Sequence, residues 1–426
     1  MSNMQHVSSS SIEVQEGWQS KNLGELAEFI NGRVFKQADW QETGVPIIRI
    51  QNLNGSNEFN YYQGEIEERH KIHNDDLLFS WSGSRGTSFG PHMWKGENGV
   101  LNQHIFKIKI NKEESLDKYY FYYALKRITQ LIEKDAHGSA GLVHITKKNL
   151  EGFSILVPSL QEQQKIASII LSVDETIEKT KFIIRQTEKV TKGLMQQLLI
   201  KGIGHTKFKK TEMGEIPEEW KVRTLGTIGT WSGGGTPSKQ EPSYWSKDKQ
   251  VIWVSPKDMY SNIITSSEDY ITEKGLREKK LKLLPKGTIL FVTRSGILRN
   301  RVPIALAGDF LTINQDLKAL QVASNIDYDF IFYTLLALND SIRTSCVKTG
   351  TTVESIDFQS LQEVLIPVPT LSEQKEIVKI IGTYYKKLEN EKYYLEYLGS
   401  LKKGLLQLLL TGKVRVKVEE EEVKQV

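Results

Sequence analysis

The sequence has almost no cysteine and no long apolar run. Cys346 is the single cysteine among 426 residues, which excludes a disulfide framework and a thiolate metal site. No apolar stretch approaches the roughly 18 residues that a helix needs to cross a bilayer. The opening MSNMQHVSSSS also lacks the basic region and the apolar core of a signal peptide. These absences predict a cytoplasmic protein without membrane contact, with a disordered tail at residues 1–16.

Signatures of common enzyme classes are also missing. The chain has no GxxxxGK[ST] phosphate loop, no GxGxxG, no HExxH, no GxSxG and no (D/N)PP(Y/F) tetrapeptide. The glycine run at 233–235 is not followed by the lysine that would reach a phosphate. His70 and His73 stand three residues apart without cysteine partners, which makes a metal site improbable. The chain is therefore predicted to have no active site, no metal and no cofactor of its own.

The charge of the chain is nearly balanced. Fifty-six Lys and Arg residues face fifty-two Asp and Glu residues, which leaves a net charge of +4. Net charge alone therefore gives no indication of nucleic-acid binding, and any basic surface must be local. With 39% hydrophobic and 25% charged residues, the composition is that of a globular protein with two to four domains.

The sequence consists of two similar halves. Trp18 is followed by Leu23-Gly24, and Trp220 is followed at the same distance by Leu225-Gly226. Further matching segments recur in the same order: PIIRI at 46–50 and VIWVS at 251–255, LLFSWSGS at 77–84 and ILFVTRSG at 289–296, Asn102-Gln103 and Asn314-Gln315. The duplication predicts two similar α+β domains, at residues 17–158 and 203–369.

Each half ends in a proline-interrupted apolar run that leads into a helix start. The two segments are ILVPSLQEQQKI at 155–166 and IPVPTLSEQKEI at 366–377. Both contain a capping box, in which a Ser or Thr hydroxyl accepts from the N3 amide and the N3 Glu reaches back to the cap amide. These segments predict long helices at 159–202 and 370–412, the second followed by a charged tail at 413–426.

Both predicted helices carry a heptad pattern of apolar residues, with steps alternating between four and three. The predicted seam residues are Ile166, Ile170, Val173, Ile177, Ile184, Leu194 and Leu198 in the first helix, and Ile377, Ile381, Tyr384, Leu388, Leu395, Leu398, Leu405 and Leu409 in the second. Polar residues such as Thr187 and Lys402 interrupt the seam. Because the helices end two similar units, antiparallel packing with approximate two-fold symmetry is the simplest arrangement. The remaining aromatic side chains either face partner proteins or cover the flanks of the domains.

Polar and basic residues lie in glycine-containing loops at matching places in the two halves. The candidates for contact with double-stranded DNA are Arg49, Gln51, Asn52, Trp81, Ser82, Ser84 and Arg85 in the first half, and Lys257, Asp258, Arg294, Ser295, Arg299, Asn300 and Arg301 in the second. Arginine can fork onto guanine, Asn and Gln can bond adenine, and Lys and Ser can bind phosphates. The loops differ between the halves while the flanking strands match, as expected of two domains that recognise different DNA sequences. The alternative is that these are ordinary solvated loops.

Together these features resemble the specificity (S) subunit, HsdS, of type I restriction-modification systems. The resemblance rests on the Trp-x4-Leu-Gly segments, the Pro-x-Leu-x-Glu-Gln helix starts, and the helix ends KGLMQQLL at 192–199 and KGLLQLLL at 403–410. It implies a non-catalytic subunit that recognises one half of a bipartite DNA site with each domain. The helices would set the half-site spacing and dock two methyltransferase (M) subunits. Those subunits would bring S-adenosylmethionine and adenine-N6 methylation, and restriction (R) subunits would bring ATP- and Mg²⁺-dependent cleavage.

Three other interpretations remain open from the sequence. The chain could be the specificity subunit of a related two-subunit system, in which one partner combines methyltransferase and nuclease. It could be a free-standing nuclease or methyltransferase whose site matches no known motif. It could also be a protein-binding scaffold. The neighbouring genes, activity of the chain unaided, and the sequence preference of DNA binding would distinguish these cases.

Overall fold

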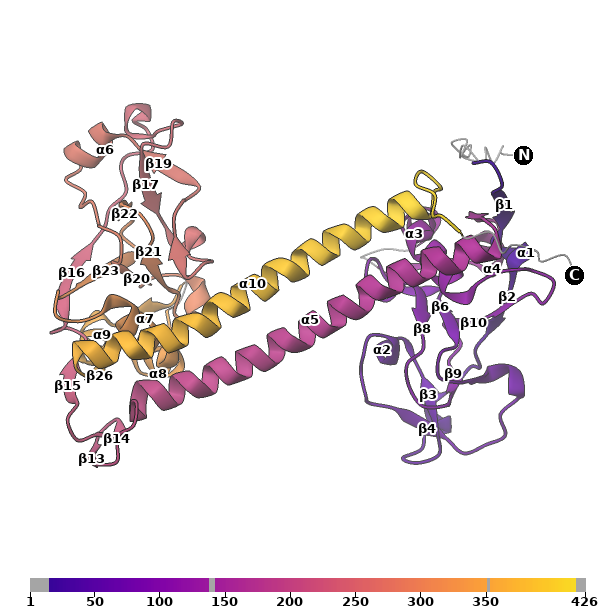
Figure 1. Ribbon diagram of the computed structural model, residues 1–426, viewed down its shortest axis with the longest axis horizontal. Helices are drawn as coiled ribbons and strands as arrows, with labels where there is room; N and C mark the ends of the chain where they lie inside the picture. The colour runs from indigo at the N-terminus through magenta and orange to yellow at the C-terminus, as the bar shows by residue number, and fades with distance from the viewer. Residues whose placement is uncertain (1–14, 138–141, 351–352, 419–426) are drawn as a thin grey trace, which may run out of the picture. The chain divides into compact units, whose positions relative to one another are not determined.

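The structure is a computed structural model that describes residues 15–137, 142–350 and 353–418 (Figure 1). These residues form two compact units. Unit 1 comprises the chain up to Lys181 together with the residues from Tyr394 onwards, and unit 2 comprises Phe182–Tyr393. Each unit contains one domain of mixed helices and strands, with parts of helices α5 (Leu160–Lys201) and α10 (Leu371–Leu409). The predicted duplicated α+β class is confirmed.

The two predicted tails fall largely outside the described residues. Of the N-terminal tail predicted at 1–16, residues 1–14 lie outside the described residues. Of the C-terminal tail predicted at 413–426, residues 419–426 lie outside them. The start of the second tail packs on unit 1, where Arg415 pairs with Glu162 at 2.7 Å and Val416 lies against the core. In the part of the chain that the structure describes, no helix combines the length and apolarity needed to cross a membrane.

The domain of unit 1 is built on two four-stranded sheets. The antiparallel first sheet has the order β2 (Ala27–Asn31), β10 (Ile105–Ile110), β6 (Leu77–Ser80) and β8 (Gly90–Met93). The second has the order β4 (Asn60–Tyr62), β3 (Val45–Ile48), β9 (Gly99–Leu101) and β5 (Lys71–Ile72), in which β3 and β9 are parallel. The other elements are β1 (Gln19–Asn22), α1 (Leu23–Leu26), α2 (Ile50–Leu53), β7 (Ser82–Ser84), α3 (Lys118–Asp135), β11 (Leu142–His144), α4 (Lys147–Glu151) and β12 (Ser154–Val157).

The domain of unit 2 repeats this plan with a larger first sheet. The five-stranded sheet has the order β16 (Gly229–Gly233), β23 (Leu317–Val322), β20 (Ile289–Val292), β21 (Ile304–Ala307) and β18 (Ile263–Ile264). The three-stranded sheet has the order β19 (Asp269–Ile271), β17 (Val251–Val254) and β22 (Leu311–Ile313), in which β17 and β22 are parallel. The other elements are β13 (Phe208–Thr211), β14 (Gly214–Pro217), β15 (Lys221–Thr224), α6 (Glu273–Glu278), α7 (Tyr328–Ala337), α8 (Asn339–Cys346), β24 (Val347–Lys348), β25 (Ser355–Ile356), α9 (Phe358–Glu363) and β26 (Leu365–Val368).

In each domain an early strand pairs with the last strand, the one that leads into a long helix. In unit 1, β1 pairs with β12 in antiparallel fashion, and in unit 2, β15 pairs with β26 in the same way. Helices α3 and α7 follow the first sheets and start at matching caps, where Asp117 accepts from the Tyr120 amide and Asp327 accepts from the Phe330 amide. Trp18 and Trp220, which the two halves share, lie beside the starts of α5 and α10, where their indoles contact Glu162 and Glu373.

Parts of both long helices complete the core of each unit. The unit 1 core includes Ile166 and Ile170 from the start of α5, together with Leu409, the last residue of α10, and Leu410, which follows it. The unit 2 core includes Leu198 and Leu199 from the end of α5, together with Ile377 and Ile381 from the start of α10. Each domain therefore depends on both helices for its apolar core.

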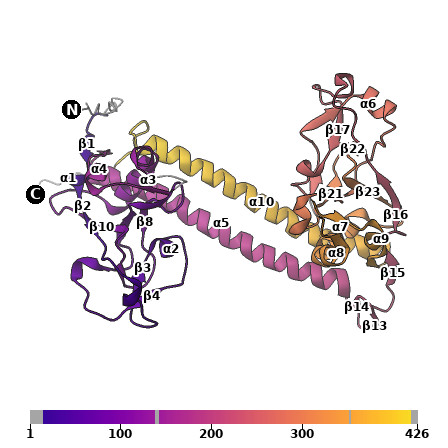
Figure 2. The same ribbon diagram turned by 180° about the vertical axis from the view of Figure 1, so that it is seen from behind.

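The helices run antiparallel within each unit, as the sequence predicts (Figure 2). In unit 1, Asp174 of α5 forms an ion pair with Lys402 of α10. In unit 2, Glu188 pairs with Lys392 at 2.8 Å, while Met195, further along α5, accepts a hydrogen bond from Tyr385, which lies earlier on α10. All predicted seam residues are buried or half-buried. The seam threonines are also buried, and the Thr191 hydroxyl donates to the Thr187 carbonyl, so this polar group is satisfied within its own helix.

Only half of each predicted capping box forms. The Glu162 amide donates to the Ser159 hydroxyl at 3.3 Å, and the Glu373 amide donates to the Thr370 hydroxyl at 3.4 Å. The glutamate side chains do not reach back to the caps as predicted. Glu162 instead accepts from the Trp18 indole at 3.2 Å and Glu373 from the Trp220 indole at 2.9 Å. An indole N–H that is buried without a partner costs more free energy than a cap amide that can reach water, so each carboxylate bonds the indole instead of the cap amide. These bonds connect the start of each domain to the long helix that follows it.

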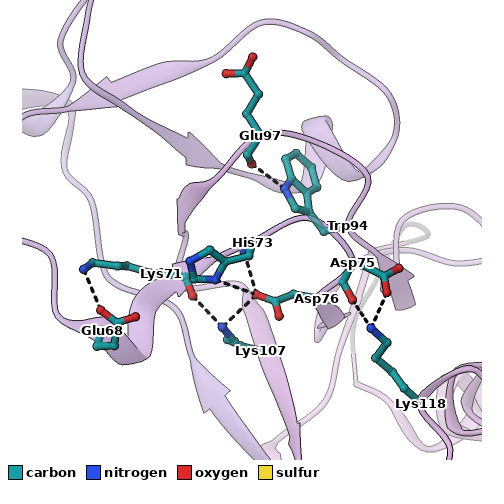
Figure 3. Close-up of polar contacts among 9 residues, drawn as sticks. All are labelled: Glu68, Lys71, His73, Asp75, Asp76, Trp94, Glu97, Lys107 and Lys118. Carbon is teal, nitrogen blue, oxygen red and sulfur yellow. Dashed lines mark hydrogen bonds and ion pairs between the residues drawn. The ribbon is translucent and has the colours of Figure 1, made fainter.

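The turn before β6 in unit 1 and the matching turn before β20 in unit 2 each contain a residue with positive φ, an aspartate in the first and a glycine in the second. Asp75 adopts φ 72°, and the matching Gly287 adopts φ 84°. The Asp75 side chain accepts from Lys118 at 2.5 Å (Figure 3). It also accepts from Lys95 at 2.6 Å and from the Tyr119 hydroxyl at 2.7 Å. Burial opposes its ionisation, but the hydrogen bonds from the two lysines and the tyrosine hold the pKa of this carboxyl well below its usual range.

We expect Asp75→Asn to destabilise unit 1 by about 1–3 kcal/mol at pH 7, because the charged hydrogen bonds are lost. The folded pKa lies below the unfolded value of about 3.9, so the stabilisation is present above that pH and is lost as the pH falls through the folded pKa. Hydrogen exchange of peptides from α3 should therefore show a mutant defect that shrinks below about pH 4. Glu67→Gln, which removes an exposed ion pair with Arg69, is the control. A defect of equal size at every pH would contradict this account.

Candidate nucleic-acid interface

Three segments of the unit 1 domain converge at one edge of the second sheet. They are the residues that follow β3, those that follow β6, and Asn102–His104 between β9 and β10. The Asn102 amide donates to the Ile48 carbonyl at 3.0 Å, and the Trp81 amide donates to the His104 carbonyl at 3.2 Å. The Trp81 indole also donates to the Gln103 carbonyl at 2.9 Å. The segment 102–104 thus joins the two loops that the sequence predicts as DNA-contacting, 49–52 and 81–85.

The same three segments converge in unit 2. The Asn314 amide donates to the Val254 carbonyl at 2.9 Å, and the Thr293 amide donates to the Asp316 carbonyl at 2.8 Å. Segment 314–316 therefore joins the loop after β17 to the loop after β20. Because β17 and β22 are parallel, as β3 and β9 are, their carboxyl ends meet at one edge and bring these loops together.

A glycine in each unit lies against the joining segment. A Cβ added at Gly32 would lie 2.1 Å from the Asn102 carbonyl oxygen. A Cβ added at Gly234 would lie 1.9 Å from the Ile313 carbonyl oxygen. Backbone oxygens cannot give way as a flexible side chain can, so only glycine permits this approach. The glycine run that the sequence analysis excluded as a phosphate loop thus has a defined packing role.

A fourth segment, which we call the hairpin arm, reaches each site: residues 142–145 in unit 1 and residues 354–356 in unit 2. The sequence did not predict this segment as part of the site. In unit 1, β11 pairs with β7, and the Ile145 amide donates to the Trp81 carbonyl at 3.0 Å. In unit 2, the Ile356 amide donates to the Thr293 carbonyl at 2.8 Å, and the Ser295 amide donates to the Glu354 carbonyl at 3.1 Å. The available signal was a run of small residues before each isoleucine, GSAG at 138–141 and TGTT at 349–352.

Two predicted DNA-contacting residues are occupied in shaping their own loops. Asn52 is 6% exposed, accepts from the Arg49 amide at 2.9 Å, and donates to two backbone carbonyls of the loop. Asp258 is 1% exposed and accepts from the Ser255 amide at 2.8 Å in the equivalent turn. These buried side chains fix the loops after the two parallel strands. Contact of either with DNA stays a prediction.

The other predicted residues of unit 1 lie nearer the surface. Arg49 donates to the Asn60 side chain at 2.9 Å and stacks over Trp40 at 5.0 Å. Ser82 and Trp81 are half-buried, and the remaining candidates are exposed: Gln51, Ser84 and Arg85. Partial burial and the nearby Arg49 charge lower the pKa of His104. This favours a neutral imidazole between the two loops.

The other predicted residues of unit 2 include several exposed cations. Lys257 pairs with Glu268 at 2.7 Å and with Asp269 at 3.0 Å, so its charge is compensated. Ser295 caps the short 3₁₀ helix at Gly296–Arg299, and Arg299 pairs with Glu354 at 2.5 Å. The remaining candidates are exposed: Arg294, Asn300 and Arg301.

Comparison with known proteins places this architecture in a family. The sequence profile of the type I restriction modification DNA specificity domain matches residues 15–189 and again residues 217–396. The chain belongs to this family. Each matched region of this specificity subunit contains one complete set of converging segments, so the family's domain covers the site in both units.

Curated relatives and solved structures agree with this assignment. The EcoR124I/EcoR124II specificity subunit of Escherichia coli is 42% identical over 171 residues, which cover 40% of this chain and 41% of that relative. The MjaVIII specificity subunit of Methanocaldococcus jannaschii is 26% identical over 414 residues, which cover 95% of each protein. The crystal structure of a type I system S subunit from M. genitalium matches with a TM-score of 0.62 at 17% identity, over 94% of this chain and 98% of that one. That structural match supports the fold.

Proposed function

We propose that each domain of this specificity subunit recognises one half of a bipartite double-stranded DNA target. The observation that carries the proposal is the repeated set of converging segments, held by the same backbone hydrogen bonds in both units. The side chains on these segments differ: unit 1 presents Arg85 and Arg49, whereas unit 2 presents Arg294, Arg299 and Arg301. A constant frame with variable polar side chains suits two domains that recognise different base sequences.

The paired helices are assigned a second role, which is to set the half-site spacing and to dock two methyltransferase subunits. Large side chains on both helices are exposed, including Phe182 at 55%, Tyr393 at 75% and Tyr397 at 56%. Exposed aromatic residues of this kind are enriched in protein interfaces. On this proposal the methyltransferase subunits supply S-adenosylmethionine chemistry, and restriction subunits supply ATP- and Mg²⁺-dependent cleavage. This chain contributes recognition without chemistry of its own.

The direct test is to co-express the chain with its neighbouring methyltransferase gene and to map methylated adenines across the host genome. The expected result is a split motif with a fixed gap, which disappears when this chain is omitted. A single undivided motif, or no methylation by a stable complex of the two proteins, would contradict the proposal. A two-subunit system with a fused methyltransferase and nuclease would give the same motif, and the domain composition of the partner would identify it.

We expect the two domains to act independently. Replacing residues 17–158 with the equivalent domain of a relative of known target should change one half of the methylated motif and leave the other half and its gap intact. The reciprocal exchange of residues 203–369 is the matched experiment and should change the opposite half. If either chimera altered both halves, recognition would not be divided between the domains.

A further inference from the structure

Glu354 is a buried carboxylate at a position where the other repeat has a core valine. The hairpin hydrogen bonds of Ile145 and Ile356 align the two units, and this alignment places Glu354 opposite Val143. Val143 is 1% exposed and belongs to the unit 1 core, and Glu354 is 5% exposed. The fold therefore accepts a valine here, and a buried carboxylate costs desolvation that a valine does not.

The carboxylate holds one arginine of the candidate interface. The Arg299 Nε donates to Glu354 Oε1 at 2.5 Å, and Glu354 Oε2 has no hydrogen-bond partner in the described part of the chain. The backbone of this arginine is also fixed, because the adjacent Leu298 is fully buried and Arg343 donates to the Arg299 carbonyl at 3.3 Å. The Arg299 side chain remains 63% exposed, whereas that of Glu354 is 7% exposed. A solvent-facing guanidinium is thus anchored at one nitrogen.

The anchoring leaves the forked end of the guanidinium available. Neither terminal nitrogen of Arg299 donates a hydrogen bond to any residue that the structure describes. These two nitrogens have the spacing to donate to O6 and N7 of a guanine in the major groove. The Glu354 charge also offsets the arginine charge, which weakens attraction to phosphates but preserves the directional donors. An arginine whose charge is neutralised and whose position is fixed is better suited to hydrogen bonds with a base than to binding the DNA phosphate backbone.

We propose that Arg299 recognises a guanine in the half-site of unit 2 and that Glu354 positions it for this contact. The inference rests on the proposed division of the target between the domains. It adds that one half of the motif contains a guanine whose recognition depends on these two side chains. Unit 1 has Val143 at the matching position and cannot build the same pair.

Arg299→Lys tests the contact because it keeps the charge and removes the fork. In the complex with the methyltransferase subunit, the variant should lose about tenfold to a hundredfold of its discrimination at one G·C pair, measured by methylation mapping and by binding to oligonucleotides with single changes. The half-site of unit 1 should be unaffected. Arg277→Lys, at an exposed arginine of α6, is the control and should leave the whole motif unchanged.

Glu354→Val tests the positioning role, and the valine of the other repeat shows that this fold accommodates it. Two effects should occur together. The preference for the same guanine should weaken, and the slope of log affinity against log salt concentration should steepen by about the amount expected for one additional phosphate contact, because Glu354 no longer neutralises Arg299. A merely structural role for Glu354 would not raise the salt dependence.

Two results would overturn the inference: Arg299→Lys retains full discrimination at every position, or it weakens binding to all sequences equally. If the wild-type complex itself produced no split motif, the proposed function would fail instead. A split motif from the wild type with unaltered specificity in both variants would remove only the Arg299–Glu354 assignment.

Discussion

Replacing Glu373 by alanine is expected to destabilise unit 2 by about 3 kcal/mol, because one carboxylate satisfies three separate donors. It accepts from the Trp220 indole at 2.9 Å, from the Ile203 amide at 3.1 Å and from the His205 ring at 2.8 Å. The donors come from the start of the domain and from the segment after α5, so the carboxylate ties both to the start of α10. Trp220 is fully buried, and its indole nitrogen would lose its partner in the variant.

The measurement is hydrogen exchange of unit 2 peptides in the full chain, which separates local loosening from global unfolding. Glu376→Ala is the matched control, since this glutamate is exposed on the same helix, and its effect should stay within about 0.5 kcal/mol. Equal hydrogen-exchange protection in Glu373→Ala and Glu376→Ala would show that the Glu373 carboxylate does not stabilise unit 2. Glu162→Ala should produce the corresponding loss in unit 1, where it frees Arg415 and the Trp18 indole.

The long helices and the duplication could be predicted because their determinants are local or periodic. A heptad pattern and a Ser or Thr hydroxyl at a helix start are read from adjacent residues, and these features appear in the structure at matching places. The glutamates of the capping boxes show the limit of such local rules. Glu162 and Glu373 have a nearby cap amide, yet each bonds a tryptophan more than 140 residues away in sequence.

The converging segments of the interface could not be placed from the sequence in the same way. Their meeting depends on parallel pairing between β3 and β9, strands that are separated by some fifty residues and five further strands. The hairpin arm that carries Glu354 depends on pairing with the loop after β20, which is equally non-local. Segments 102–104 and 314–316 were recognisable as repeats, but nothing local to them predicts that they join two loops.

Residue type alone also does not separate a base-contacting side chain from one that shapes a loop. Asn52 and Asp258 have the hydrogen-bonding groups that bases require, and both are directed into the backbone of their own turns. Arg299 belongs to the same candidate set but has its forked end exposed. The difference lies in burial and partners, which are set by how each loop folds after its strand.

Among glycine-to-alanine substitutions in unit 2, Gly234→Ala is expected to lower the free energy of unfolding most. The new Cβ would lie 1.9 Å from the Ile313 carbonyl oxygen and 2.5 Å from that of Asn314. The end of β16 must then move away from segment 314–316, which breaks the junction between the loops after β17 and β20. We expect a loss of about 4 kcal/mol or more, in the range typical of severe overpacking.

Gly296→Ala is the control, because a Cβ at that glycine of the same interface would meet nothing within 4 Å. Hydrogen exchange should show lost protection around β22 and β23 in the first variant and near wild-type protection in the second. Methylation of the split motif should fall at least about tenfold with Gly234→Ala, since a misplaced interface forfeits more than about 1.4 kcal/mol of binding. Gly32→Ala should do the same through unit 1, where its Cβ would lie 2.1 Å from the Asn102 oxygen. If Gly234→Ala behaved like Gly296→Ala, the joining segment would not be what holds the recognition loops together, and the frame that both units share would need another physical basis.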